Sequence, residues 1–90
     1  MRVAIHYCPK CGWLLRSAWL AQELLTTFSE ELSEVALCPS PTAGTFGIYL
    51  GEQALWLRQR DGGFPQPKEL KQRLRDLIAP NKDLGHSDRP

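Results

Sequence analysis

Two cysteines separated by two residues are the feature of this chain that most directly suggests chemistry. Cys8 and Cys11 lie in the run Cys-Pro-Lys-Cys-Gly, between a β-branched, aromatic segment and a long helical pattern. The free N–H groups and the dipole at a helix N-terminus stabilise a thiolate and lower its pKa. Lys10 adds a cation within the same turn. Because a thiolate of lowered pKa is more abundant and leaves more readily, the pair predicts thiol–disulfide exchange.

The same pair also fits a structural zinc site. Cys-Pro-x-Cys-Gly occurs in zinc knuckles, but a structural site needs four ligands and the chain has no second Cys-x-x-Cys. The remaining candidates are Cys38, His6 and His86, and because His86 lies in the expected tail, His6 and Cys38 would have to complete the set. Zinc knuckles are normally held by turns between short hairpins, whereas here a strand leads into an amphipathic helix. The position of the pair therefore favours redox chemistry over zinc binding and over an inert pair.

Three more residues are candidates for accessory roles. Cys38 ends a short apolar run that we expect to lie parallel to the first strand, beside the cysteine turn. We expect a small buried residue there, and a thiol that resolves a mixed disulfide is the alternative. His6 is expected to be an ordinary strand residue, with tuning of Cys8 as the other hypothesis. Pro41 is expected to end its strand, or else to form a cis-proline wall beside the cysteines.

The surrounding residues predict the element order β-α-β-β-β-α. From apolar alternation and turn residues, strands are predicted over residues 2–7, 35–38, 45–50 and 54–58. Helices are predicted over residues 13–28 and from Pro67 to Pro80, because proline suits the first turn of a helix and stops its end. We expect the buried stripe of the first helix to comprise Leu14, Ala18, Ala21, Leu25 and Phe28, with Leu24 widening it.

This order predicts an α/β two-layer domain of the thioredoxin-like type, with a four-stranded mixed sheet. The strand, helix and second strand form a right-handed parallel unit, the hairpin extends the sheet, and both helices lie on one face. The other face lacks a cover, which predicts a homodimer or another partner there. Residues 1–80 are expected to form the domain, and residues 81–90 a flexible tail.

Composition excludes several function classes. Among the 90 residues, 11 Lys and Arg stand against 10 Asp and Glu, a net charge of +1, so we expect neither nucleic-acid nor membrane binding. No apolar run approaches the ~20 residues of a membrane span, and the N-terminus lacks the apolar core of a secretory signal. Three cysteines, an odd number, disfavour a secreted disulfide scaffold. We expect a cytoplasmic protein without a cofactor.

In its ordered set of motifs, the chain resembles the Rdx family of selenoprotein W, T and H-like proteins. The resemblance extends to about Pro80 and rests on Tyr-Cys-Pro-Lys-Cys at 7–11, the run 13–25, Gly-Thr-Phe at 44–46, Gly51, and Gly-Gly-Phe-Pro at 62–65. It implies a thioredoxin-like fold and a redox motif formed by Cys8 and Cys11. In selenium-containing members, selenocysteine occupies the position that is Cys11 here.

Which of the two cysteines attacks a partner is left open by the sequence, because two observations point to different residues. Thioredoxin chemistry points to Cys8 and the selenium position to Cys11; we favour Cys8, because we expect Cys11 to be more shielded by the helix. The predicted function is a thiol–disulfide oxidoreductase or redox adaptor that exchanges with a protein thiol or glutathione. The alternative is a redox-sensing binding module whose surface includes Trp19, Tyr49 and Trp56.

Overall fold

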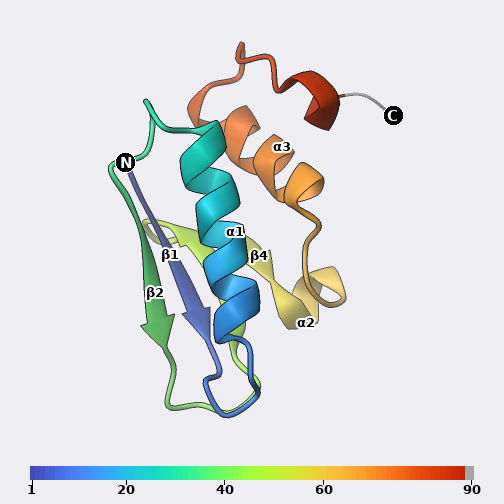
Figure 1. Cartoon of the computed structure of the whole chain (residues 1–90). Helices are drawn as coiled ribbons and strands as arrows, with labels where there is room; N and C mark the ends of the chain where they lie inside the picture. The colour runs from blue at the N-terminus through green and yellow to red at the C-terminus, as the bar shows by residue number, and fades with distance from the viewer. Residues whose placement is uncertain (89–90) are drawn as a thin grey trace.

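The computed structural model describes residues 1–88 and shows a four-stranded sheet with the two longer helices on one face (Figure 1). In chain order, the elements are β1 (Arg2–Tyr7), α1 (Leu14–Thr27), β2 (Glu34–Pro39), β3 (Phe46–Leu50), β4 (Gln53–Leu57), α2 (Arg58–Asp61), α3 (Pro67–Ile78) and the 3-10 helix η1 (Gly85–Asp88). The predicted β-α-β-β-β-α order is confirmed. The short helices α2 and η1 are additions that the sequence patterns did not indicate.

The sheet has the strand order β2-β1-β3-β4. Strand β1 runs parallel to β2 and antiparallel to β3, and β3 and β4 form an antiparallel hairpin. Alternate β1 residues face the helices, because side chains on a strand alternate between the two faces of the sheet. The core is lined by Val3, Ile5 and Ile48 from the sheet and by Leu20, Leu24, Leu70 and Leu74 from α1 and α3.

The buried stripe of α1 matches the prediction in part. Ala21, Leu24 and Phe28 are buried as expected, but the centre of the stripe is rotated by about one residue. The buried helix residues are Ser17, Leu20, Ala21 and Leu24, whereas Leu14 and Leu25 are exposed. A leucine-rich helix offers two overlapping apolar stripes, and tertiary packing selects the one that includes the polar Ser17. Burial of Ser17 is tolerated because its hydroxyl donates to the carbonyl of Trp13 at 2.8 Å.

A β-bulge in the hairpin overturns the prediction that Trp56 lies on the surface. Ile48 pairs with Trp56 and Tyr49 pairs with Ala54, so Leu55 is the extra residue. A bulge interrupts the alternation of side chains between the two faces. Leu55 and Trp56 are therefore both buried, with Trp56 only 4% exposed.

The segment after α3 is tied to that helix. The Arg75 guanidinium donates to the carbonyl of Lys82 at 2.9 Å and to the carboxylate of Asp88 at 2.8 Å. Flexibility of residues 81–90 stays a prediction. Within the described residues, no helix is long and apolar enough to cross a membrane.

Candidate redox site

Cys8 and Cys11 form a disulfide at the end of β1, with their Cα atoms 5.3 Å apart. Cys8 follows the last residue of β1, and the chain then turns, with the Gly12 amide donating to the carbonyl of Pro9 at 3.1 Å. Gly12 has a φ of +76°, in the left-handed region that favours glycine. Glycine after the second cysteine thus allows the tight turn that brings the two thiols together.

The two cysteines differ in exposure, in the opposite sense to the prediction. Cys8 is 1% exposed, whereas Cys11 is exposed. The predicted shielding of Cys11 is wrong because α1 begins only at Leu14. Cys11 therefore lies in the turn that precedes the first residue of α1. Of the two cysteines, Cys11 is therefore the more accessible to solvent.

A depression with a volume of about 370 Å³ adjoins the disulfide. Its lining comprises Cys8, Pro9, Lys10, Ser40, Pro41 and Ala43. The Ser40 amide donates to the carbonyl of Tyr7 at 2.8 Å, which holds the loop after β2 against the start of the turn. Pro41 therefore does lie beside the disulfide. The cis-proline hypothesis is wrong, because no cis peptide bond occurs among the described residues.

Cys38 and His6 lie side by side on the sheet face away from α1, as register partners of β2 and β1. Cys38 is a free, partly exposed thiol, so the expectation of a buried residue is wrong. The reason is that β2 is an edge strand and neither long helix covers this face. The His6 ring contacts Tyr49 edge-on, with ring centroids 5.4 Å apart.

The described part of the chain contains no group of three or more His, Cys, Asp or Glu side chains placed to hold a metal ion. The four ligands considered for zinc are not assembled into one site. Cys8 and Cys11 are joined to each other, while His6 and Cys38 are neighbours on the uncovered face of the sheet.

An aromatic cluster flanked by two arginines lies immediately after the cysteine turn, and the sequence reasoning missed it. Phe64 contacts Trp13 and Phe46, with ring centroids 5.0 and 4.8 Å apart. The Arg16 guanidinium lies 4.1 Å from the Phe64 ring centre, and that of Arg58 lies 5.0 Å from the Trp13 ring centre. The cluster therefore places two cations close to the residues that follow Cys11.

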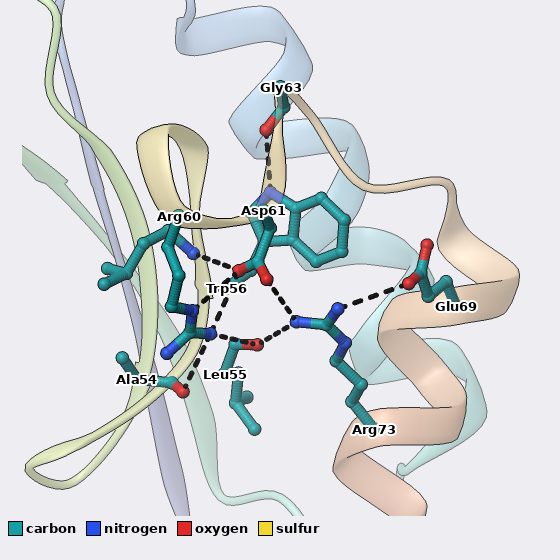
Figure 2. Close-up of polar contacts among 9 residues, drawn as sticks. Ala54, Leu55, Trp56, Arg60, Asp61, Gly63, Glu69 and Arg73 are labelled. Carbon is teal, nitrogen blue, oxygen red and sulfur yellow. Dashed lines mark hydrogen bonds and ion pairs between the residues drawn. The ribbon is translucent and has the colours of Figure 1, made fainter.

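A polar clasp at the end of β4 holds the loop that carries Phe64 (Figure 2). Trp56 donates its indole N–H to the carbonyl of Gly63 at 2.8 Å. The carboxylate of Asp61 accepts the Leu57 amide at 2.9 Å and pairs with Arg73 of α3 at 3.2 Å. Arg73 also lies 4.4 Å from the centre of the Trp56 ring. These contacts link β4, α2 and α3, and they fix the position of the loop before α3.

Asp61 is the best-connected carboxylate of this clasp. Its pKa is lowered from 3.8 to about 2, chiefly by the hydrogen bond from the Leu57 amide and then by Arg60 and Arg73. Arg60 donates from two guanidinium nitrogens to the same carboxylate oxygen, at 3.2 and 3.0 Å. The clasp therefore depends on an ionised Asp61.

Comparison with known proteins agrees with this geometry. The model of the Rdx family matches residues 2–76. A solved structure from Bordetella parapertussis is 57% identical, with a TM-score of 0.82, covering 86% of this chain and 96% of that chain. A selenoprotein W-related protein from Vibrio cholerae is 56% identical, with a TM-score of 0.82, covering 86% of this chain and 95% of that chain. No match was found among curated proteins.

Proposed function

The chain belongs to the Rdx family, and from this premise we propose that it is a thiol–disulfide oxidoreductase whose working pair is Cys8 and Cys11. The observation that carries the proposal is the pairing of an exposed and a buried cysteine in one turn. An exposed thiolate can attack a partner, and a shielded neighbour can then resolve the mixed disulfide. A partly exposed free thiol, Cys38, fits a reducing cytoplasmic location.

In the proposed reaction, the reduced protein transfers two electrons to a disulfide of a partner protein or of glutathione. The Cys11 thiolate attacks one partner sulfur and displaces the other as a thiolate, which takes up a proton. Cys8, after losing its proton, then attacks the Cys11 sulfur and releases the second partner thiol. The products are the Cys8–Cys11 disulfide and two partner thiols, and a dithiol reductant returns the protein to its starting state by the reverse exchange.

The surroundings of the turn support Cys11 as the attacking group. Lys10 is its direct neighbour, and Arg16 lies near the start of the helix that follows. Nearby cations favour the thiolate form of a cysteine. The resemblance to selenium-containing relatives points to the same position. A binding module without turnover has less support, because Trp56, part of its predicted surface, is buried.

The test compares Cys8→Ser, Cys11→Ser and the control Cys38→Ser, each in the otherwise unchanged chain. We expect Cys8→Ser to accumulate a stable mixed disulfide on Cys11 with glutathione or a cysteine peptide. Cys11→Ser should slow the first exchange step by at least about tenfold, because the remaining thiol is shielded. The control should react at the rate of the unmodified protein.

Mass spectrometry of the trapped species and stopped-flow rates provide the measurement. The two cysteines would have the opposite roles if the mixed disulfide formed faster on Cys8 in the Cys11→Ser variant than on Cys11 in the Cys8→Ser variant. Unchanged exchange in both single variants would overturn the proposed function.

A further inference from the structure

Large apolar side chains lie exposed on α1 directly after the redox turn. Leu14, Leu15 and Trp19 form what we call the α1 apolar strip, and Leu15 is 82% and Trp19 48% exposed. Leu15 and Trp19 are four residues apart on one helix, so their side chains are neighbours on its surface. Exposed apolar groups that adjoin one another beside a reactive site are typical of a binding surface.

Three cations lie in the cysteine turn or against the residues that follow it, and we call them the cationic rim. Lys10 is part of the turn, Arg16 is on α1, and the Arg58 guanidinium lies 5.0 Å from the centre of the Trp13 ring. Within residues 1–88, none of the three forms an ion pair with a carboxylate. The first acidic residue of the chain is Glu23, so α1 has no carboxylate near its redox end. The net charge of +1 conceals a concentration of positive charge at this end of the molecule.

We infer that the substrate cysteine belongs to an acidic protein segment with apolar side chains next to the cysteine. Its sulfur meets Cys11, its apolar side chains cover the α1 apolar strip, and its carboxylates face the cationic rim. This inference rests on the proposed exchange at Cys8 and Cys11. It names the class of partner at that site.

The α1 apolar strip, and not the charge, is the reason that an acidic protein segment should be a better substrate than glutathione. Glutathione carries carboxylates that would suit the cationic rim, but it has no apolar side chain to bury against Leu15 and Trp19. Trp19 also lies about 7.5 Å further along the helix axis than Leu14, at 1.5 Å per residue. A longer segment reaches both the disulfide and the whole strip.

Charge also favours an acidic segment over a second copy of the chain as the occupant of the α1 apolar strip. A symmetric contact of the strip with itself would place the two cationic rims, each containing Arg16, face to face. Like charges opposed across an interface oppose association. An acidic segment of another protein lacks this penalty.

The experiment measures how fast the reduced protein reduces cysteine peptides, each linked by a disulfide to a chromophoric thiol. One peptide carries Glu and Leu around its cysteine, the second replaces Leu by Ser, the third replaces Glu by Lys, and oxidised glutathione is the small reference. We expect the Glu-Leu peptide to react about tenfold faster than either altered peptide. The advantage over the Lys peptide should fall at about 0.5 M salt, where charges are screened.

Variants with matched controls test whether the preference for the Glu-Leu peptide arises from the α1 apolar strip and the cationic rim. Leu15→Ser and Trp19→Ser should each slow the Glu-Leu peptide about fivefold and leave the glutathione rate within about twofold. Leu77→Ser removes a comparably exposed side chain, 45% exposed on α3, and should change neither rate. Arg16→Gln should slow the Glu-Leu peptide at low salt, and Arg2→Gln, at the other end of β1, should not.

The outcomes separate the inference from the proposed function. Equal rates for all peptides, unaffected by Leu15→Ser and Trp19→Ser, would overturn the inference and leave exchange intact. Absence of exchange with every disulfide would overturn the proposed function itself. A dimer in sedimentation that Trp19→Ser dissociates would assign the strip to a second copy and would also overturn the inference.

Discussion

At the scale of single residues, the residue proposed to react and the residues that stabilise the fold around it are different ones. Cys11 is exposed in a short turn, whereas Cys8 and Trp56 are buried. Asp61 carries no reaction, yet it ties β4 to α3 through Leu57 and Arg73. Its charge therefore contributes to the stability of the fold that supports the redox turn.

The pH dependence of the free energy of unfolding should show how much the charge of Asp61 contributes to stability. Its folded pKa of about 2 lies below the ordinary value of 3.8, so its contribution is complete well above pH 4 and disappears as pH falls from about 4 through about 2. Asp61→Asn should lower the free energy of unfolding by about 1–2 kcal/mol at pH 7 and by much less near pH 2. Urea titrations at several pH values measure this difference.

The exposed carboxylate of Glu52, in the β3–β4 turn, provides the control. Glu52→Gln should cause no comparable loss of stability at pH 7. A deficit in Asp61→Asn that is the same at every pH would show that the charge of Asp61 has no part in the clasp.

At the scale of elements, the β3–β4 hairpin shows how one extra residue reorganises a strand. The bulge at Leu55 turns Trp56 into the core. On the opposite face, Tyr49 lies over Gly47: a Cβ added at Gly47 would lie 2.9 Å from the Tyr49 ring and 3.1 Å from the Leu57 side chain. Glycine is therefore favoured here by the close approach of two side chains, and its φ is not in the left-handed region.

A double-mutant cycle tests this contact. Gly47→Ala should lower the free energy of unfolding by about 1–2 kcal/mol, because the tyrosine ring must move. In a Tyr49→Ala background, the same substitution should cost much less, since only the Leu57 contact remains tight. Thermal unfolding of the four proteins gives the coupling energy. Equal costs in both backgrounds would assign the effect to the backbone or to Leu57.

Some features of these elements follow from local sequence patterns, and others depend on tertiary packing. Period-two alternation was sufficient to predict β1, and the proline positions were sufficient to predict α3, since those patterns are local. The parallel pairing of β1 with β2 was predicted from the order strand, helix, strand. The bulge, the rotation of α1 and the exposure of Cys11 depend on which tertiary packing is realised, so local patterns did not reveal them. The aromatic cluster joins Trp13 to Phe64, residues that are far apart in the chain, so no local pattern predicted that contact.

At the scale of the whole molecule, one sheet face is covered by helices and the other displays His6, Cys38 and Tyr49. A homodimer through this second face stays a prediction, and sedimentation equilibrium tests it. The described end of the chain is fastened to the helical side: Asp88 accepts from Arg75 and from the Leu84 amide, at 2.8 and 2.7 Å. Both contacts lower the pKa of Asp88, that with Arg75 more strongly.

Arg75 should therefore control how firmly this last segment is held. Arg75→Gln should accelerate hydrogen exchange at the Leu84 amide by about tenfold, because Asp88 loses its charged partner. Exchange at Leu24, in the core of α1, should change much less and serves as the control. Unchanged exchange at Leu84 would show that η1 is held by other contacts.

The first residue is fastened as well, and its position has a practical consequence. The Met1 carbonyl accepts both the amide and the hydroxyl of Ser33, at 2.7 and 2.9 Å. Met1 and η1 lie toward one end of the molecule, and the cysteine turn lies toward the other (Figure 1). An affinity handle or a sensor surface attached at the end of the molecule that carries Met1 and η1 would leave the cysteine turn facing away from the point of attachment, which suits the protein to oriented immobilisation.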